Sequence, residues 1–79
     1  MKILKLYDEA GKFTYIIMDN VRRIVHEGNQ FIFVFDDKDR VIIDVKLDYT
    51  NKISEAIELL LSDKRNMMDV YYMRYQNGQ

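Results

Sequence analysis

The sequence contains no cysteine, no proline, a single histidine and only three glycines. Without cysteine the chain can form neither disulfide bonds nor thiolate metal sites, and its composition suits a reducing compartment. The glycines are Gly11, Gly28 and Gly78, and they are far apart, so no glycine-rich phosphate-binding loop is present. These absences exclude cysteine chemistry and phosphate binding by such a loop.

Long apolar runs and a strong charge of one sign are also missing. No stretch approaches the roughly 18 apolar residues of a membrane span. Residues 1–6 alternate apolar and basic side chains instead of forming the apolar centre of a signal peptide, so we expect a cytoplasmic protein. The formal net charge is −1, with both signs interspersed, which disfavours non-specific attraction of polyanions.

Length and composition predict one small ordered domain over residues 1–79, with a frayed tail at residues 76–79. Hydrophobic residues make up 48% of the chain and charged residues 32%, which is typical of a globular protein. A domain this short buries only about 60 to 65% of its unfolded surface, so its core is thin. We therefore expect it to depend on a partner surface or on a second copy.

Alternating apolar residues predict an α+β fold: an antiparallel sheet of four to six strands, with one amphipathic helix packed on one face. Apolar residues recur at helical spacing between Ile53 and Leu61, and Thr50 or Asn51 is the expected N-cap. Residues 67–75 are predicted as a final strand, with a short second helix as the alternative. The other predicted strands cover residues 2–7, 13–18, part of 21–27, 31–35 and 40–46.

Several of these strands are apolar on both sides, as is expected of strands that are covered on both faces. One helix can cover only one face, so the C-terminal segment, a second copy of the chain or another protein must cover the other. Aromatic residues and methionine are enriched at the centres of interfaces. We therefore predict a homodimer or a protein partner, although the C-terminal tyrosines could instead close the core of the monomer. The predicted interface residues are Ile32, Val34, Val70, Tyr71, Tyr72, Met73 and Tyr75.

No pattern in the sequence indicates catalysis, a metal or a cofactor. His26 has no recognisable nucleophile motif near it, so we predict that the protein is not an enzyme. The acidic residues of segment 36–48 fail the calcium-loop pattern. Counted from Asp37, its fifth and sixth positions are Val41 and Ile42. Segment 36–39 is better explained as a solvated turn between two strands.

The alternative hypothesis is a nucleic-acid-binding accessory protein. It would use Arg22, Arg23, Arg40 and Arg74 together with the C-terminal tyrosines, since arginine beside tyrosine suits phosphate contact and base stacking. The RNA-binding sheet signature is missing, and the balanced charge argues against this function. Solvated charges at sheet edges explain the same residues.

One set of short features resembles a bacterial family. These are the turn at Gly11, Tyr15-Ile16-Ile17, Asp19-Asn20-Val21 followed by Ile24, Asp44-Val45-Lys46, and Ile53 followed by Ala56-Ile57. Together they resemble the small bacterial FlbD-like proteins and similar phage-encoded proteins of unknown function. The resemblance covers the chain through Leu61 and implies a small, strand-rich accessory protein without catalytic residues. Our leading hypothesis is accordingly a non-enzymatic accessory or regulatory module that binds proteins and self-associates.

Overall fold

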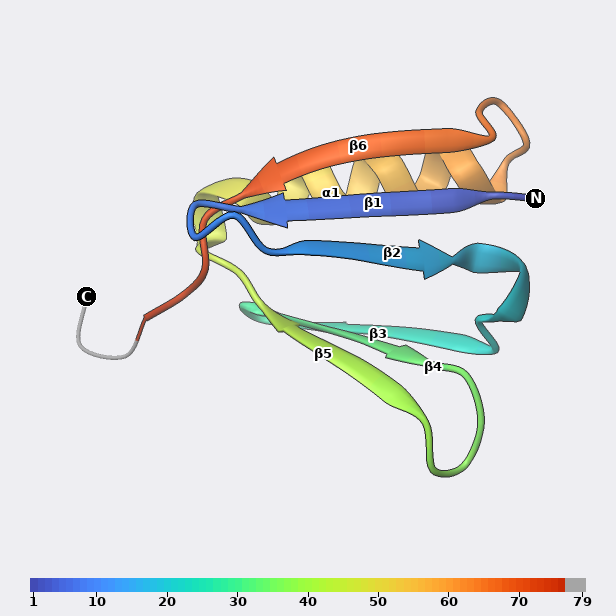
Figure 1. The fold of residues 1–79 in the computed structure, drawn as a ribbon, viewed down its shortest axis with the longest axis horizontal. Coiled ribbons are helices and arrows are strands. Elements are labelled where there is room, and N and C mark those ends of the chain that lie inside the picture. The colour runs from blue at the N-terminus through green and yellow to red at the C-terminus, as the bar shows by residue number, and fades with distance from the viewer. Residues whose placement is uncertain (77–79) are drawn as a thin grey trace.

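Strands and one helix enclose a continuous hydrophobic core in the computed structural model, which describes residues 1–76 (Figure 1). Most of these elements fall where the sequence pattern predicts them. Their bounds are β1 Ile3–Asp8, β2 Phe13–Ile17, the short 3-10 turn η1 Met18–Asn20, β3 Arg23–Glu27, β4 Gln30–Val34, β5 Arg40–Asp44, α1 Leu47–Leu61 and β6 Met67–Tyr72.

The six strands form two small sheets, which confirms the α+β class and refines the prediction of one antiparallel sheet. The first sheet has the order β2-β1-β6, and the second has the order β3-β4-β5. The second sheet is antiparallel throughout, whereas β1 pairs antiparallel with β2 and parallel with β6. The direction of β6 escapes a prediction from the sequence because no hairpin turn joins it to β1. Its neighbour comes from the other end of the chain.

The hairpin between β1 and β2 is closed by Asp8. Its Oδ1 accepts hydrogen bonds from the backbone N–H groups of Ala10 and Lys12, both at 3.0 Å. Gly11 has a φ of +80°, a left-handed conformation that glycine adopts without strain. This polar turn explains why a short loop suffices to reverse the chain.

The helix begins earlier than its apolar stripe predicts. Lys46 occupies the N-cap position, and its backbone N–H donates to the carbonyl oxygen of Met73 at 2.9 Å. Thr50 lies inside the helix and donates its hydroxyl to the carbonyl oxygen of Leu47 at 2.8 Å. The predicted N-cap at Thr50 or Asn51 is therefore wrong, because a tertiary hydrogen bond rather than a capping side chain holds the first turn.

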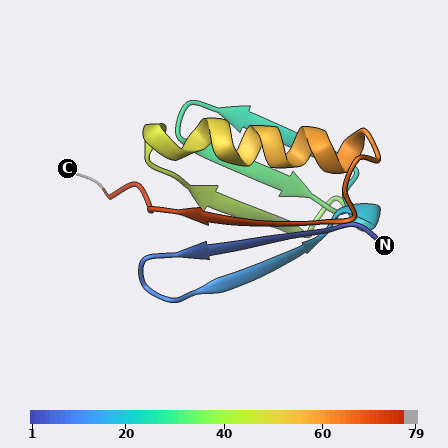
Figure 2. The same ribbon diagram turned by 90° about the horizontal axis from the view of Figure 1, so that it is seen from above.

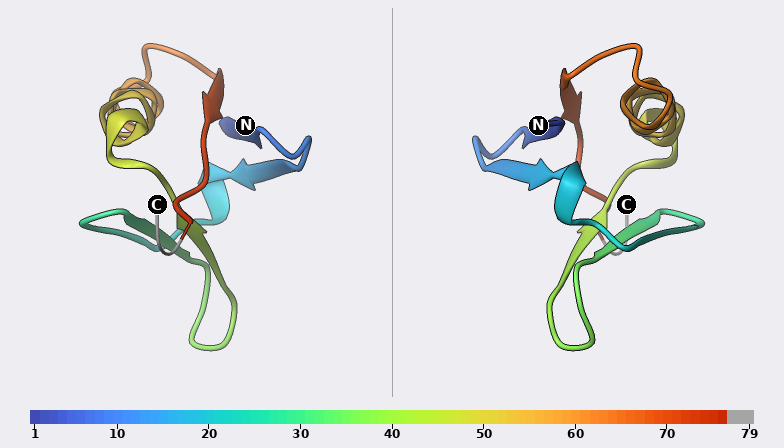
Figure 3. Two further views of the ribbon diagram at one scale, coloured as in Figure 1. Left: turned by 90° about the vertical axis from the view of Figure 1, so that its left-hand side faces the viewer. Right: turned by 90° about the vertical axis from the view of Figure 1, so that its right-hand side faces the viewer.

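End-on views show that α1 and the two sheets surround the core from three sides (Figure 3). The helix packs against β6 and β1, and β4 and β5 close the core from below. Along each strand, alternate residues point inward, as the period of two requires. The buried hydrophobic residues are Leu4, Leu6, Ile16, Met18, Phe31, Phe33, Ile43, Val45, Ile53, Ala56, Ile57, Leu60, Val70 and Tyr72.

The C-terminal segment joins the two sheets. The strand predicted for residues 67–75 is confirmed over Met67–Tyr72, beside β1. The chain then crosses to the end of β5 (Figure 2). There Arg74 forms an isolated antiparallel β-bridge with Val45. The N–H of Tyr75 donates to the carbonyl oxygen of Asp44 at 3.1 Å. Of the tail predicted at 76–79, residues 77–79 lie outside the described residues, and Gln76 is exposed. Within residues 1–76, the single helix is too short to cross a membrane.

Candidate protein-interaction face

The sheet β2-β1-β6 turns one side to the core and the other side to solvent. We call the solvent side the outer face. Three consecutive outward positions on each strand build it, so it is a grid of three rows across three strands. Its residues are Phe13, Tyr15 and Ile17 on β2, Tyr7, Lys5 and Ile3 on β1, and Tyr71, Asp69 and Met67 on β6.

The strand register places side chains of similar chemistry in the same row of the outer face. One end row is aromatic: the ring centroids of Tyr7 and Phe13 are 5.8 Å apart, and those of Tyr7 and Tyr71 are 5.5 Å apart. Tyr49 of α1 extends this row, with its centroid 5.9 Å from that of Tyr71 in an edge-on arrangement. The opposite end row, Ile3, Ile17 and Met67, is apolar. The outer face is thus apolar at both ends.

The middle row holds the only two charges of the outer face. The Lys5 ammonium lies 5.0 Å from the ring centroid of Phe13 and 5.6 Å from that of Tyr15, a cation–π arrangement. Asp69 is the register partner of Lys5 on β6, yet it takes part in none of the ion pairs within residues 1–76. The lysine therefore leans toward the rings of β2 and leaves the carboxylate to solvent.

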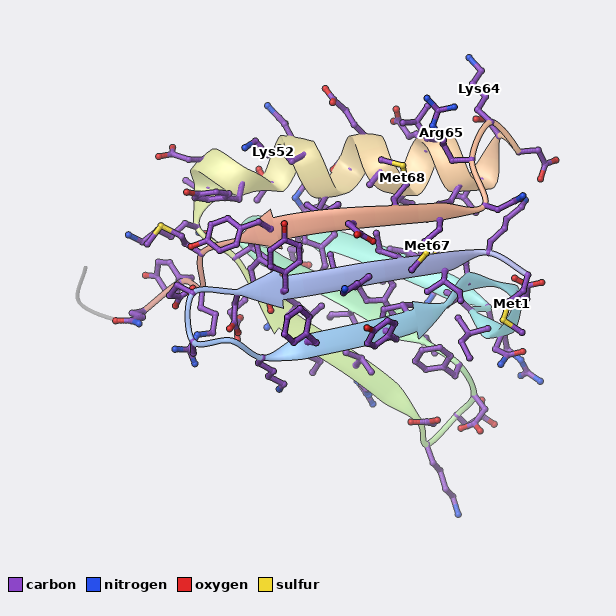
Figure 4. All side chains as sticks on the ribbon, turned by 45° about the horizontal axis from the view of Figure 1, so that its top comes forward. Met1, Lys52, Lys64, Arg65, Met67 and Met68 are labelled. Atoms are coloured by element: carbon purple, nitrogen blue, oxygen red, sulfur yellow. The ribbon has the colours of Figure 1, made fainter. Side chains whose placement is uncertain are left out.

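Large side chains of the outer face are unusually accessible. Tyr15 is 57% exposed, Phe13 55% and Met67 50%. Rings cover β1 and β2 on the side turned to the viewer in Figure 4, where Met67 also lies over this face. Isolated exposed apolar residues are ordinary, but a contiguous apolar and aromatic patch marks an interaction surface. This outer face is the strongest candidate functional site of the described chain.

The predicted interface residues fall into four places. Val70 and Tyr72 are core residues, 6% and 4% exposed, so they are not available to a partner. Tyr71 alone belongs to the outer face. Ile32 and Val34 lie half-buried on the outer side of the β3-β4-β5 sheet, whereas Met73 and Tyr75 lie in the segment that joins the sheets.

Sequence reasoning missed most of the outer face, although the signal was present. Phe13, Tyr15 and Ile17 alternate with Thr14 and Ile16, so β2 is apolar on both sides. That pattern predicts that one side of β2 needs a cover. It does not say which side, because the choice depends on where α1 and the second sheet pack.

The arginines proposed for nucleic-acid binding do not form one surface. Arg23 and Arg40 flank Val34 across β4, but Asp36 and Asp37 line the same groove. Arg74 lies at the other end of β5, where its Nε donates to Oε1 of Glu9 at 3.0 Å. The pKa of Arg74 is raised chiefly by this hydrogen bond. Its charge is thus engaged within the fold.

A cleft of about 490 Å³ lies between the two sheets and away from the outer face. Asp8 borders it, but the Oδ2 atom of Asp8 is buried without a hydrogen bond and lies 3.6 Å from Nε of Arg74. A buried carboxylate beside a guanidinium is explained by charge compensation within the fold. This ion pair helps hold the segment after β6, which contains Arg74, against the turn between β1 and β2.

Residues considered for catalysis or metal binding serve local structure. The His26 ring stacks on Phe31 with centroids 4.1 Å apart, and its Nε2 lies 3.2 Å from the carbonyl oxygen of Gly28. Oδ1 of Asp36 accepts the N–H groups of Lys38 and Asp39, both at 2.8 Å, which closes the turn between β4 and β5. Within residues 1–76, no group of three or more His, Asp or Glu side chains is placed to hold a metal.

Acid is expected to weaken the turn between β4 and β5 that Asp36 closes. The pKa of Asp36 is lowered, first by the N–H of Lys38 and then by that of Asp39. Its contribution to stability is therefore present above the unfolded-state pKa, about 4, and is lost as the pH falls through the lower folded-state pKa. Asp36→Asn should melt below the wild type at neutral pH, and the difference should vanish in acid. Circular dichroism melts across the acid range would contradict this if the difference stayed constant.

Comparisons of the chain with protein families, with curated proteins and with solved structures found no match. The geometry of the chain itself is therefore the basis for proposing a function.

Proposed function

We propose that the protein is a non-enzymatic interaction module that self-associates through its outer face. The observation that carries this proposal is the contiguous apolar and aromatic grid on one side of the β2-β1-β6 sheet. Burial of apolar surface stabilises by about 25 cal/mol per Å², so covering this grid is favourable. A partner surface supplies that cover.

A second copy of the chain suits the outer face better than a strongly charged partner does. The face carries one positive and one negative side chain, so its own net charge is zero. Its aromatic row offers large rigid rings, which are typical anchors at interface centres. The small size of the domain adds to the argument, because a thin core gains most from a second copy.

The outer side of the β3-β4-β5 sheet is the weaker alternative surface. Val25, Ile32 and Val34 are half-buried there, and Ile42 is 49% exposed. Arg23 and Arg40 surround this smaller apolar strip, so it is more polar than the outer face. It therefore offers a matched site for a control substitution.

Sedimentation at rising micromolar concentration tests the proposal. The wild type should approach twice its 9.5 kDa monomer mass. Tyr15→Glu should weaken association by about tenfold or more, since it removes an exposed ring and places a charge in the interface. Lys5 lies close enough to the ring of Tyr15 to accept the new carboxylate, so the monomer should keep its fold.

Ile42→Glu is the matched control, because it places the same charge at an exposed strand position of the other sheet. It should leave the assembly unchanged. A wild type that stays monomeric throughout would contradict the proposed function. Dissociation by Ile42→Glu but not by Tyr15→Glu would assign the interface to the other sheet. Adding a random oligonucleotide to the same runs tests the nucleic-acid alternative, which requires salt-sensitive binding.

A further inference from the structure

The outer face carries its two opposite charges side by side in its middle row. Lys5 and Asp69 are register partners on β1 and β6, but the Lys5 ammonium is held over the rings of β2. Asp69 remains outside the ion pairs of residues 1–76. A carboxylate at the border of an apolar face is suited to receive a cation from a molecule that covers the face.

The positions of these charges restrict how two outer faces can stack about a two-fold axis. An axis along β1 sets Lys5 against Lys5 of the second copy. An axis across the strands sets each strand against the same strand of the second copy. Lys5 then faces Lys5 of the second copy, and Asp69 faces Asp69 of the second copy. Juxtaposed like charges oppose association. An axis along the strands between β2 and β1 leaves Asp69 without a cation.

We infer that the two copies stack about an axis that runs along the strands between β1 and β6. This inference rests on the proposed self-association and specifies its geometry. Lys5 then lies opposite Asp69 of the second copy, and Asp69 lies opposite Lys5 of the second copy. Two equivalent ion pairs form at the centre of an apolar interface, where charges interact more strongly than in water.

The same axis matches the two end rows of the outer face. Tyr7 lies opposite Tyr71 of the second copy, so aromatic rings meet aromatic rings. Ile3 lies opposite Met67 of the second copy, so aliphatic groups meet a flexible thioether that adapts to the available space. Because the axis is parallel to the strands, neither row meets the other one. Each row thus meets its own chemistry.

An axis between β1 and β6 also shifts the two outer faces sideways relative to each other, so that β2 of each copy covers a surface beside β6 of the other. With β1 over β6 of the second copy, β2 lies over the groove beside β6. This groove of about 290 Å³ runs between β6 and α1, and Met68 projects toward the helix there (Figure 4). Its helix side is formed by Lys52, Glu55, Ala56 and Leu59. Stable interfaces bury about 800 Å² per partner, and the groove adds area to that of the three-stranded face.

Charge reversal at the two positions tests this arrangement. Lys5→Glu sets two carboxylates together at each pair, and Asp69→Lys sets two ammonium groups together. Each variant alone should form homodimers about tenfold more weakly or worse than the wild type. An equimolar mixture of the two should form a heterodimer of near wild-type affinity, because every pair is then of opposite charge. The double variant should self-associate like the wild type.

Native mass spectrometry of the mixture distinguishes the heterodimer when one variant is isotopically labelled. Lys38→Glu is the control, because it reverses a charge in the exposed β4–β5 loop away from the outer face and should not alter assembly. A wild-type dimer whose single variants associate normally, or whose mixture gives no heterodimer preference, would overturn this axis and leave the proposed function standing. A monomeric wild type would overturn both.

Discussion

Tyr72→Asp is expected to remove most of the domain's stability. Tyr72 is 4% exposed in the core at the end of β6, so an aspartate there loses the ring contacts and buries a carboxylate. Such changes cost about 4 kcal/mol or more, against a total of roughly 5 kcal/mol for a small domain. Far-ultraviolet circular dichroism in increasing urea measures the loss.

Tyr71→Asp is the matched control, because it makes the same change one residue earlier on the opposite side of β6. Tyr71 lies on the outer face and is 37% exposed, and partial desolvation is the main cause of its raised pKa. We expect this variant to lose about 1 kcal/mol of monomer stability and to weaken self-association. Equal destabilisation by the two substitutions would contradict the in-and-out pattern of β6.

Phe33→Ala should have the second largest effect on the fold. Phe33 on β4 is completely buried where the second sheet meets the core. Removing its ring leaves a cavity and should cost about 3 to 5 kcal/mol. Urea unfolding should then show a midpoint shifted far toward zero denaturant with little change in slope.

Phe13→Ala compares the same side-chain truncation on the outer face. Phe13 is 55% exposed, so the dilute monomer should lose only about 1 kcal/mol. At concentrations where the wild type self-associates, the same variant should weaken assembly, since its ring belongs to the aromatic row. A monomer destabilised as strongly by Phe13→Ala as by Phe33→Ala would mean that the outer face is not exposed.

Local patterns predicted most of the elements. The apolar stripe from Ile53 to Leu61 predicts α1 because residues three and four apart share a helix face. The hairpins follow from polar turns such as the one that Asp8 and Gly11 close. The start of α1 could not be predicted, because the hydrogen bond from Lys46 to Met73 joins residues far apart in the sequence.

Division of the strands into two sheets was not predictable from the same patterns. Alternation along a strand predicts which side chains share a face, and this is local information. The neighbour of each strand depends on packing between distant segments, as the parallel pairing of β6 with β1 illustrates. A strand such as β2, apolar on both sides, fits several pairings equally well.

The same distinction between local sequence patterns and packing of distant segments holds for the candidate site. By itself the sequence determined that the strands carry more apolar surface than one helix can cover, because its composition and alternation are properties of single segments. Only the tertiary structure decided which surface remains uncovered. The second sheet and α1 both pack on one side of β2-β1-β6, so that side became core. The opposite side, which gathers Tyr7, Phe13 and Tyr71 from three separate strands, was left to solvent.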